Sequence, residues 1–393
     1  MLSSSTGGLS RFGGRGWLNV FALAVGLVAC IPTVGVQGRV FDPDSLEPLA
    51  GVAVRARSAE TTTDASGQYR LEVPAGVREL VFAMSDRPAV RKFVIVENLE
   101  EHRLDALLPK QKPEGAGLAI SRTWNVDDGV NGWGTDVEIG PELSVHDRFG
   151  NDDRFPNYQT SEGVWPEALR LSDDGRTLFF AQNFLGPESG TQKGLYRLEL
   201  ESNTVTALHP AQPFWARSLD LSPDGKTLVA VGNEDWLLVD EPFSPTPRAR
   251  SIENPVAGSF AQVMFAFDGG LFVVRAPSNT FEATRLFWPS LRVDPAWSAG
   301  DPVYTQRVLT LPTGELLVDG RGGIRKRTVG GAWSQVLSLE GESSDVIGWD
   351  QARGAVYYLL GSATHKNLHW RHLASGLDLL LVSNAEDCSP LRL

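Results

Sequence analysis

The chain has 393 residues, of which 42% are hydrophobic and 21% charged, so it is long enough for two domains and too apolar to be disordered. Its 36 basic and 48 acidic residues give a net charge of −12, which excludes a charge-driven grip on nucleic acid. The 40 Gly, 24 Pro and 11 Trp residues, with only 2 Cys, indicate many short strands joined by tight turns, without a disulfide framework. We therefore expect an all-β fold.

The first thirty residues predict a secretion signal. Arg11 and Arg15 precede an apolar stretch at 17–29, which is shorter than the roughly 20 residues that a membrane-spanning helix needs. The stretch ends in Leu27-Val28-Ala29-Cys30, which resembles the lipobox of bacterial lipoproteins. The resemblance implies that residues 1–29 are removed and that the thiol of Cys30 carries diacylglycerol. The alternative is an ordinary secretory signal with an incidental cysteine.

The same resemblance implies a location. Ile31 follows the cysteine, where Asp favours retention in the inner membrane of Gram-negative cells. The resemblance therefore implies the outer membrane or cell envelope, with the protein either periplasmic or surface-exposed. With Cys30 acylated, Cys388 has no disulfide partner, and its position near the end of the sequence predicts an exposed thiol.

Alternating apolar residues predict a small β-sandwich over residues 30–108. The pattern Gly38-x-Val40, Pro48-Leu49-x-Gly51-Val52 and Thr63-Asp64-x-x-Gly67-x-Tyr69 closely resembles the carboxypeptidase-regulatory-like, transthyretin-like family. The resemblance implies a rigid spacer or adhesion module without an active site of its own. We expect Tyr69 to pack in the core. The strands are expected near 36–40, 52–56, 69–73, 80–83 and 93–96.

Residues 109–120 predict a linker. They contain two Pro and two Gly and have no apolar period. We expect the domain boundary in this segment.

Residues 121–393 contain an internal repeat. Leu171-Ser-Asp-Asp-Gly175 returns as Leu221-Ser-Pro-Asp-Gly225, and weaker copies have turn glycines at 269, 314 and 354. A spacing of about 45 residues suits four strands and their turns, which is one blade of a β-propeller. The segments Ser-Pro-Asp-Gly-Lys and Leu-Tyr-x-Leu-x-Leu closely resemble the repeats of periplasmic Tol-type propellers.

The number of blades follows from ring closure. Five blades are clear, and Trp124-Asn-Val-Asp-Asp-Gly129 marks a sixth unit, although the sequence after it fits a blade poorly. A propeller must close so that its first and last blades leave no exposed strand edge. We expect a propeller of about six four-stranded blades at 121–393.

The motifs of common enzymes are missing from the sequence. Gly225-Lys226-Thr227 resembles the end of a phosphate-binding loop, but that loop needs Gly at position 220, where the chain has Asp. Neither Gly-x-Ser-x-Gly nor His-Glu-x-x-His occurs. His365, His369 and His372 have helical spacing, but in a strand the last two point to opposite faces, so we expect no metal there. The sequence predicts a protein that is not an enzyme and has no cofactor.

A polar and aromatic insert at 124–165 is the candidate ligand-binding loop. Its carboxylates suit calcium, and exposed aromatic rings stack on sugars. The ordered spacing of a calcium loop is absent, so the main expectation is an ordered loop that caps the propeller or packs on the sandwich. Asp174, Asp224 and Asp268 precede turn glycines and are interpreted as turn residues. The candidate ligand residues are Asp127, Asp128, Trp133, Asp152, Asp153 and Tyr158.

Together these features predict a cell-envelope lipoprotein. A lipid anchor holds it to the membrane, the sandwich is a spacer, and the propeller is a binding scaffold whose loops contact an envelope protein or glycan. Two alternatives stay open. One is a propeller enzyme of the lactonase or quinoprotein kind, with a metal or quinone in the central channel, and the other is an envelope adhesin that binds glycans through the insert.

Overall fold

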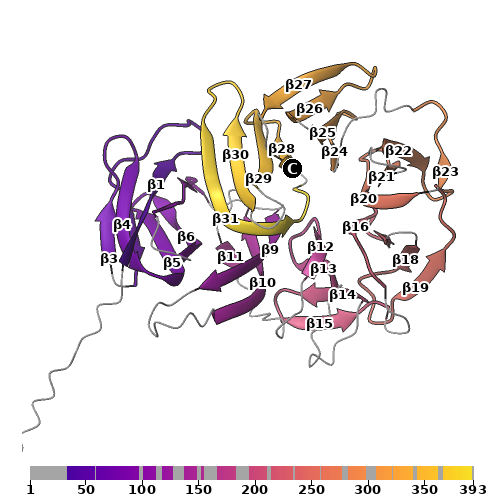
Figure 1. The fold of residues 1–393 in the computed structure, drawn as a ribbon, viewed down its shortest axis with the longest axis horizontal. Coiled ribbons are helices and arrows are strands. Elements are labelled where there is room, and N and C mark those ends of the chain that lie inside the picture. The colour runs from indigo at the N-terminus through magenta and orange to yellow at the C-terminus, as the bar shows by residue number, and fades with distance from the viewer. Residues whose placement is uncertain are drawn as a thin grey trace, which may run out of the picture. The chain divides into compact units, whose positions relative to one another are not determined.

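Contacts divide the chain of the computed structural model into two units, at 1–31 and 32–393. The described residues all belong to the second unit, and their regular secondary structure consists of strands (Figure 1). The predicted all-β fold is therefore confirmed. The described residues are 33–57, 59–96, 101–111, 117–126, 137–147, 152–154, 166–182, 194–209, 214–232, 235–256, 258–276, 282–297, 307–320, 322–339, 343–361 and 366–391.

The first eight strands form the predicted β-sandwich. One sheet has the order β4-β1-β7, with β8 also paired to β1, and the other has the order β3-β2-β5-β6. All five expected strands are present, each within about two residues of its expected limits at one end or both. The strands are β1 (Thr33–Phe41), β2 (Ala53–Ala56), β3 (Ala59–Thr62), β4 (Gln68–Pro74), β5 (Gly76–Met84), β6 (Arg87–Val96), β7 (His102–Arg103) and β8 (Ala106–Leu107).

Alternation along the strands builds the sandwich core. In β4, residues 69, 71 and 73 are buried while their neighbours 68, 70 and 72 are exposed. The ring of Tyr69 meets that of Phe82 edge-on at 5.5 Å, and its hydroxyl donates to the Leu104 carbonyl at 2.7 Å. Tyr69 therefore packs in the core, as the sequence predicts.

The remaining strands form the blades of a propeller, seen face-on in Figure 1. Four blades are β12–β15, β16–β19, β20–β23 and β24–β27, each a sheet with its strands in chain order. The strands are β9 (Gly117–Val126), β10 (Val137–Asp147), β11 (Asp152–Arg154), β12 (Pro166–Leu171), β13 (Thr177–Gln182), β14 (Gly194–Glu199), β15 (Thr204–Ala207), β16 (Ser218–Leu221), β17 (Thr227–Val231), β18 (Trp236–Asp240), β19 (Arg248–Ile252), β20 (Ser259–Phe265), β21 (Leu271–Ala276), β22 (Glu282–Phe287), β23 (Arg292–Val293), β24 (Val308–Thr310), β25 (Leu316–Gly320), β26 (Gly323–Arg327), β27 (Trp333–Ser338), β28 (Ser343–Asp350), β29 (Ala355–Gly361), β30 (Lys366–His372) and β31 (Asp378–Cys388).

The ring closes through the last strand. A seven-stranded sheet has the order β11-β10-β9-β31-β30-β29-β28. The first half of β31 pairs with β30 as the outer strand of the fifth blade, and residues 385–388 pair with β9. The second half of β31 is thus the inner strand of a sixth blade that β9, β10 and β11 complete. Among the described strands this gives six four-stranded blades, as expected.

The sixth blade corrects three details of the sequence interpretation. β9 begins at Gly117, so the last four residues of the predicted linker 109–120 belong to the propeller. The insert 124–165 is not simply a loop, because it contains β10 and β11, which are outer strands of this blade. Cys388 is buried and not exposed, since it lies in the closing strand.

The end of the chain also pairs with the fifth blade. The Leu391 N–H donates to the Ile347 carbonyl at 2.8 Å, and Leu391 forms a parallel bridge with Gly348. A Cβ at position 348 would lie 2.8 Å from the Leu391 Cβ, so the close approach of the two backbones requires glycine.

The sandwich packs directly on the closing strand. Phe41 and Leu107 of the sandwich share one core with Leu118, Trp370 and Leu381 of the propeller. Strand β31 is an edge of the fifth blade, and sandwich groups bind its free backbone atoms. The Asp105 N–H donates to the Leu380 carbonyl at 2.8 Å, and the Leu380 N–H donates to the Asp105 carboxylate at 3.0 Å.

Two cations of the sandwich extend this contact. Lys92, which is buried, donates from Nζ to the Leu381 carbonyl at 2.9 Å, and Arg39 donates to the Asp378 carbonyl at 3.0 Å. Asp105 is fully buried, and its carboxylate accepts bonds from the Arg39 N–H at 2.8 Å and from the Arg103 guanidinium at 2.6 Å. The sandwich and the propeller are therefore joined by a buried polar and apolar contact as well as by the linker.

Candidate functional site

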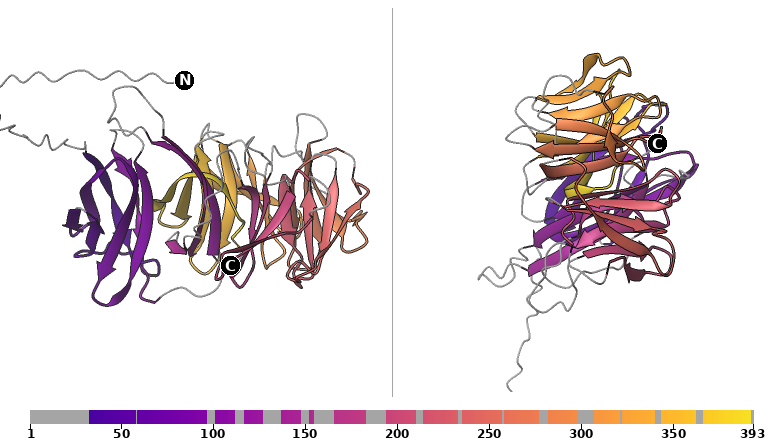
Figure 2. Two further views of the ribbon diagram at one scale, coloured as in Figure 1. Left: turned by 90° about the horizontal axis from the view of Figure 1, so that it is seen from below. Right: turned by 90° about the vertical axis from the view of Figure 1, so that its right-hand side faces the viewer.

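The strands of the propeller run between its two ends, as the side view in Figure 2 shows. The two ends differ in the lengths of the connections between strands. At one end, turns of four or five residues join the first two strands of the five blades that begin with β12, β16, β20, β24 and β28. At the opposite end some connections between strands are much longer, such as those at 183–193 and 294–307. We call these the tight-turn end and the long-connection end. Trp215, Arg307 and Lys366 are described residues of the long-connection end, and the side chain of Trp215 is half exposed.

The predicted turn residues have the expected role at the tight-turn end. The Asp174 carboxylate accepts bonds from the Ser172 hydroxyl at 2.6 Å and the Arg176 N–H at 3.0 Å. Asp224 does the same for Ser222 and Lys226, and Asp268 accepts a bond from the Gly270 N–H. Gly225, with φ of 70°, has the left-handed conformation that such a turn requires. The interpretation of these aspartates as turn residues is confirmed.

A buried ion pair links the first blades around the axis. Nε of Arg170 on β12 lies 2.7 Å from Oδ1 of Asp220 on β16, and both side chains are almost fully buried. The other oxygen of Asp220 accepts a bond from the Phe265 N–H on β20 at 2.6 Å. One carboxylate thus joins the inner strands of three consecutive blades.

Neutral side chains continue these links to the next blade. The Gln262 amide of β20 donates to the Val308 carbonyl at 3.1 Å and accepts from the Val308 N–H at 2.6 Å. The Thr310 hydroxyl of β24 donates back to the Phe265 carbonyl at 3.0 Å. The third and fourth blades are therefore held in register by side chains bonded to inner-strand backbone.

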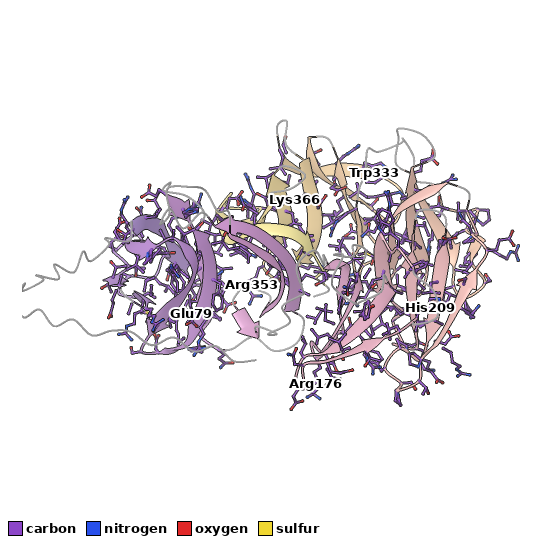
Figure 3. All side chains as sticks on the ribbon, turned by 60° about the horizontal axis from the view of Figure 1, so that its bottom comes forward. Glu79, Arg176, His209, Trp333, Arg353 and Lys366 are labelled. Atoms are coloured by element: carbon purple, nitrogen blue, oxygen red, sulfur yellow. The ribbon has the colours of Figure 1, made fainter. Side chains whose placement is uncertain are left out.

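A cluster of charges completes the ring near the long-connection end. Arg307 donates to the Cys388 carbonyl of the closing strand at 3.0 Å, and its Nε lies 3.9 Å from the Asp345 carboxylate. Lys366, which is labelled in Figure 3, also pairs with Asp345. Asp345 is buried on β28. This cluster connects the fourth, fifth and sixth blades, and its chemistry is that of a structural ion pair.

The Asp345 carboxylate gives the ring a predicted acid sensitivity. Burial raises the pKa of Asp345, but the charges of Arg307 and Lys366 outweigh it and hold this pKa below the ordinary value of 3.8. A group whose pKa is lowered by folding stabilises the protein above its unfolded pKa and loses that effect as the pH falls through the folded pKa. We expect Asp345→Asn to lower the free energy of unfolding by about 1–3 kcal/mol at pH 7.

Urea unfolding from pH 7 to pH 3 measures this effect. The difference between the wild type and Asp345→Asn should stay constant down to about pH 4 and shrink below it, because the carboxylate of the wild type then becomes protonated. A difference that is the same at pH 7 and pH 3 would contradict the assignment.

Most of the predicted ligand residues fall outside the described residues. Cys30, Asp127, Asp128, Trp133 and Tyr158 are among those not described. Asp152 and Asp153 begin β11, where position 152 pairs with position 146 of β10. Lipidation and a calcium or glycan role therefore stay predictions.

His369 and His372 lie on opposite faces of β30, as expected, whereas His365 lies outside the described residues. Nδ1 of His369 lies 3.0 Å from the Asp378 carboxylate, and its ring stacks on Tyr358 at 5.3 Å. His372 bonds to the Ser375 hydroxyl at 2.7 Å and its ring stacks on Trp370 at 6.3 Å. Over the described residues, no group of three His, Cys, Asp or Glu side chains is arranged to hold a metal ion.

The sequence reasoning missed the contact between sandwich and propeller. Of its central residues, Asp105 carries a local signal, because it is the one charged residue of the apolar run Leu104-Asp-Ala-Leu-Leu108. Lys92 stands beside Arg91 in Val90-Arg-Lys-Phe-Val94, where the signal is weaker. Charged residues are rarely fully buried without a partner. The signal indicates a buried partner, but the partner lies almost 300 residues along the chain.

Comparison with known proteins supports both halves of the fold. The sequence model of the carboxypeptidase regulatory-like domain matches residues 35–108, so this part of the chain is a domain of that kind. The structure of TolB from Acinetobacter baumannii is similar with a TM-score of 0.51 and 11% identity, over 81% of this chain and 80% of that chain. At this identity the likeness shows the fold alone, a β-propeller behind the sandwich.

Two further structures are similar at lower scores. The propeller domain of Cps50 (Swd1) from Myceliophteria thermophila has a TM-score of 0.42 and 12% identity, over 63% of this chain and 80% of that chain. A putative 6-phosphogluconolactonase from Bacteroides uniformis has a TM-score of 0.41 and 13% identity, over 70% of this chain and 99% of that chain. No curated protein matches the sequence.

Proposed function

We propose that the protein is a lipid-anchored scaffold of the bacterial cell envelope, whose propeller binds a protein partner and catalyses no reaction. The observation that carries the proposal is that polar side chains around the axis bond to the protein itself. Asp220, Gln262 and Asp345 are bonded to neighbouring inner strands or to the cations beside them, so they hold the ring together. A lactonase or quinoprotein site would instead need polar groups directed at a ligand in the channel.

The asymmetry of the two ends supports binding at the long-connection end. The tight turns repeat one local design, in which an aspartate carboxylate satisfies backbone N–H groups. The connections at the other end differ from blade to blade in length and sequence. Loops on a rigid framework are where proteins most often place binding residues, so this end is the better candidate for a partner.

The lipobox-like sequence before Cys30 supports the anchor. A diacylated and N-acylated cysteine buries enough methylene groups for stable attachment, whereas a single acyl chain is marginal. Among the described residues no helix has the length and apolar character to span a membrane.

Replacing Cys30 with alanine is expected to move the protein from the membrane fraction to the soluble fraction, because the acylated thiol is lost. Fractionation of cells that express each form measures the change. Cys388→Ala is the matched control: Cys388 is buried in the closing strand, so this variant should stay with the membrane. A Cys30→Ala protein that sediments wholly with membranes would disprove the anchor.

Cross-linking in cells tests the scaffold role. A discrete protein partner cross-linked to the anchored form and absent with Cys30→Ala would support the proposal. Turnover of a lactone by the purified protein, abolished by a metal chelator, would overturn it in favour of an enzyme. Retention on polysaccharide that Trp133→Ala and Tyr158→Ala together abolish, with no protein cross-link, would favour a glycan-binding adhesin.

A further inference from the structure

The sandwich contacts β31 at several positions along the strand. These contacts show which end of the sandwich lies towards which end of the propeller. In the fifth blade, β30 begins at the long-connection end with Lys366, and β31 runs antiparallel to it. Asp378 of β31 therefore lies towards the tight-turn end and Val382 towards the long-connection end. The sandwich residues that bond to successive positions of β31 therefore show how the sandwich strands are oriented relative to these two ends.

Three contacts fix that order. Near the tight-turn end, Arg353 of the turn between β28 and β29 pairs with Asp44, which follows β1 (Figure 3 labels Arg353). Arg39, near the end of β1, bonds to the Asp378 carbonyl. Lys92, in the middle of β6, bonds to the Leu381 carbonyl, which is three residues closer to the long-connection end.

The other ends of β1 and β6, at Thr33 and Val96, lie on the side of the long-connection end. Arg87, at the start of β6, pairs with Asp42, so β6 proceeds from the tight-turn side through Lys92 to Val96. Val96 pairs with Gly76 of β5, and Thr33 pairs with Pro74 of β4. Because residues 74 and 76 flank a single turn, Thr33 and Val96 share one end of the sandwich, on the side of the long-connection end.

The chain between the anchor and this end is short. Only Ile31 and Pro32 separate Cys30 from Thr33, and three peptide units span at most about 11 Å. The sandwich cannot swing freely, because the buried Asp105 and Lys92 join it to β31. An acyl group on Cys30 therefore holds the Thr33 end of the sandwich, which lies on the side of the long-connection end, close to the bilayer.

From this geometry we infer that the anchored protein stands with its long-connection end towards the membrane, and that its partner there is a protein embedded in the same membrane. The inference rests on the proposed lipidation of Cys30. A soluble partner would approach the tight-turn end, which faces the aqueous compartment. That end carries the exposed side chains of Phe243, Phe267 and Val329, and none of them would meet lipid.

Fluorescence quenching in vesicles tests the orientation. The lipidated protein, in the Cys388→Ala background, carries one fluorophore on a new cysteine at Glu72, Arg217 or Lys226, all of which are exposed. Glu72 lies near Thr33, Arg217 at the long-connection end and Lys226 at the tight-turn end. Ser218 pairs with Val231, so Arg217 lies level with position 232 and is separated from Lys226 by about six residues along a strand, or about 20 Å.

Phosphatidylcholine vesicles with a spin label on the lipid headgroup should quench the fluorophores at 72 and 217 at least about twofold more than that at 226, since the sites differ by about 20 Å in height. Protein that does not float with the vesicles would disprove the lipid anchor. Protein that floats but is quenched equally at all three sites, or most at 226, would overturn the orientation while leaving the anchor intact.

Photo-cross-linking in cells tests the class of partner. A cross-linking amino acid at position 217 should capture a protein that only detergent extracts from the membrane, and the same group at position 226 should not. Cross-links from position 217 to lipid alone, or to proteins that a salt wash releases, would overturn the inference of a membrane-embedded partner.

Discussion

Replacing Asp105 with alanine is expected to lower the free energy of unfolding by about 3–5 kcal/mol, because it leaves two backbone N–H donors without their acceptor and removes the partner of the half-exposed Arg103 guanidinium. The carboxylate accepts bonds from the Arg39 N–H, the Leu380 N–H and the Arg103 guanidinium, and it is fully buried. The bond to Leu380 crosses from the sandwich to the propeller. We therefore expect the wild type to unfold in a single transition and Asp105→Ala to unfold in two.

Urea unfolding followed by tryptophan fluorescence measures both effects. Residues 33–108 contain no tryptophan, so far-ultraviolet circular dichroism must follow the sandwich in parallel. Asp44→Ala is the control, since it removes an ion pair to Arg353 in which the Asp44 side chain is 58% exposed. Such a pair is worth about 1 kcal/mol or less. A loss below about 1 kcal/mol for Asp105→Ala, equal to the control, would contradict the role given to this contact.

Asp220→Ala is the second change with a large expected effect, again about 3–5 kcal/mol. This single substitution removes both the buried partner of the Arg170 guanidinium and the acceptor for the Phe265 N–H. Because Asp220 joins three inner strands, we expect the melting temperature to fall and proteolysis within the first three blades to become faster. Thermal unfolding and limited proteolysis measure the two effects.

A double variant separates the ion pair from its surroundings. Arg170→Met with Asp220→Leu removes both charges, and it should recover part of the stability lost in Asp220→Ala, because no buried cation remains that has only the exposed Asp173 as its ion-pair partner. Asp240→Ala is the matched control, since Asp240 pairs with Arg250 at a site where both side chains are more than one third exposed. Equal losses for Asp220→Ala and Asp240→Ala would rule out a central role for the buried pair.

Local patterns explain which parts of the fold the sequence predicts well. The turn around Gly225 depends on residues within five positions of one another, so its repetition at about 45-residue intervals reveals five blades. The sandwich motif around Gly67 and Tyr69 is likewise local, and the family match covers the same residues. These features need no knowledge of distant contacts.

The sixth blade depends on a contact that no local pattern contains. The Ala119 N–H donates to the Ser389 hydroxyl across 270 positions of the sequence. Without the inner strand from the far end of the chain, residues 117–154 resemble a polar insert more than a blade. The same reason hides the contact of Asp105 with Leu380, which is 275 positions away. Of the candidate site, the turn role of Asp224 was predictable, whereas the links around the axis required the folded ring.

The closing strand also sets the order in which the protein can be made. A ribosome releases the sandwich and the first blades long before residues 385–388, which supply the inner strand of the sixth blade. Until then β9 has an unpaired edge, and the side of the ring between β12 and β28 stays open. Newly made chains therefore pass through a stage with exposed strand edges, and assistance from a chaperone would matter most until residues 385–388 have been made.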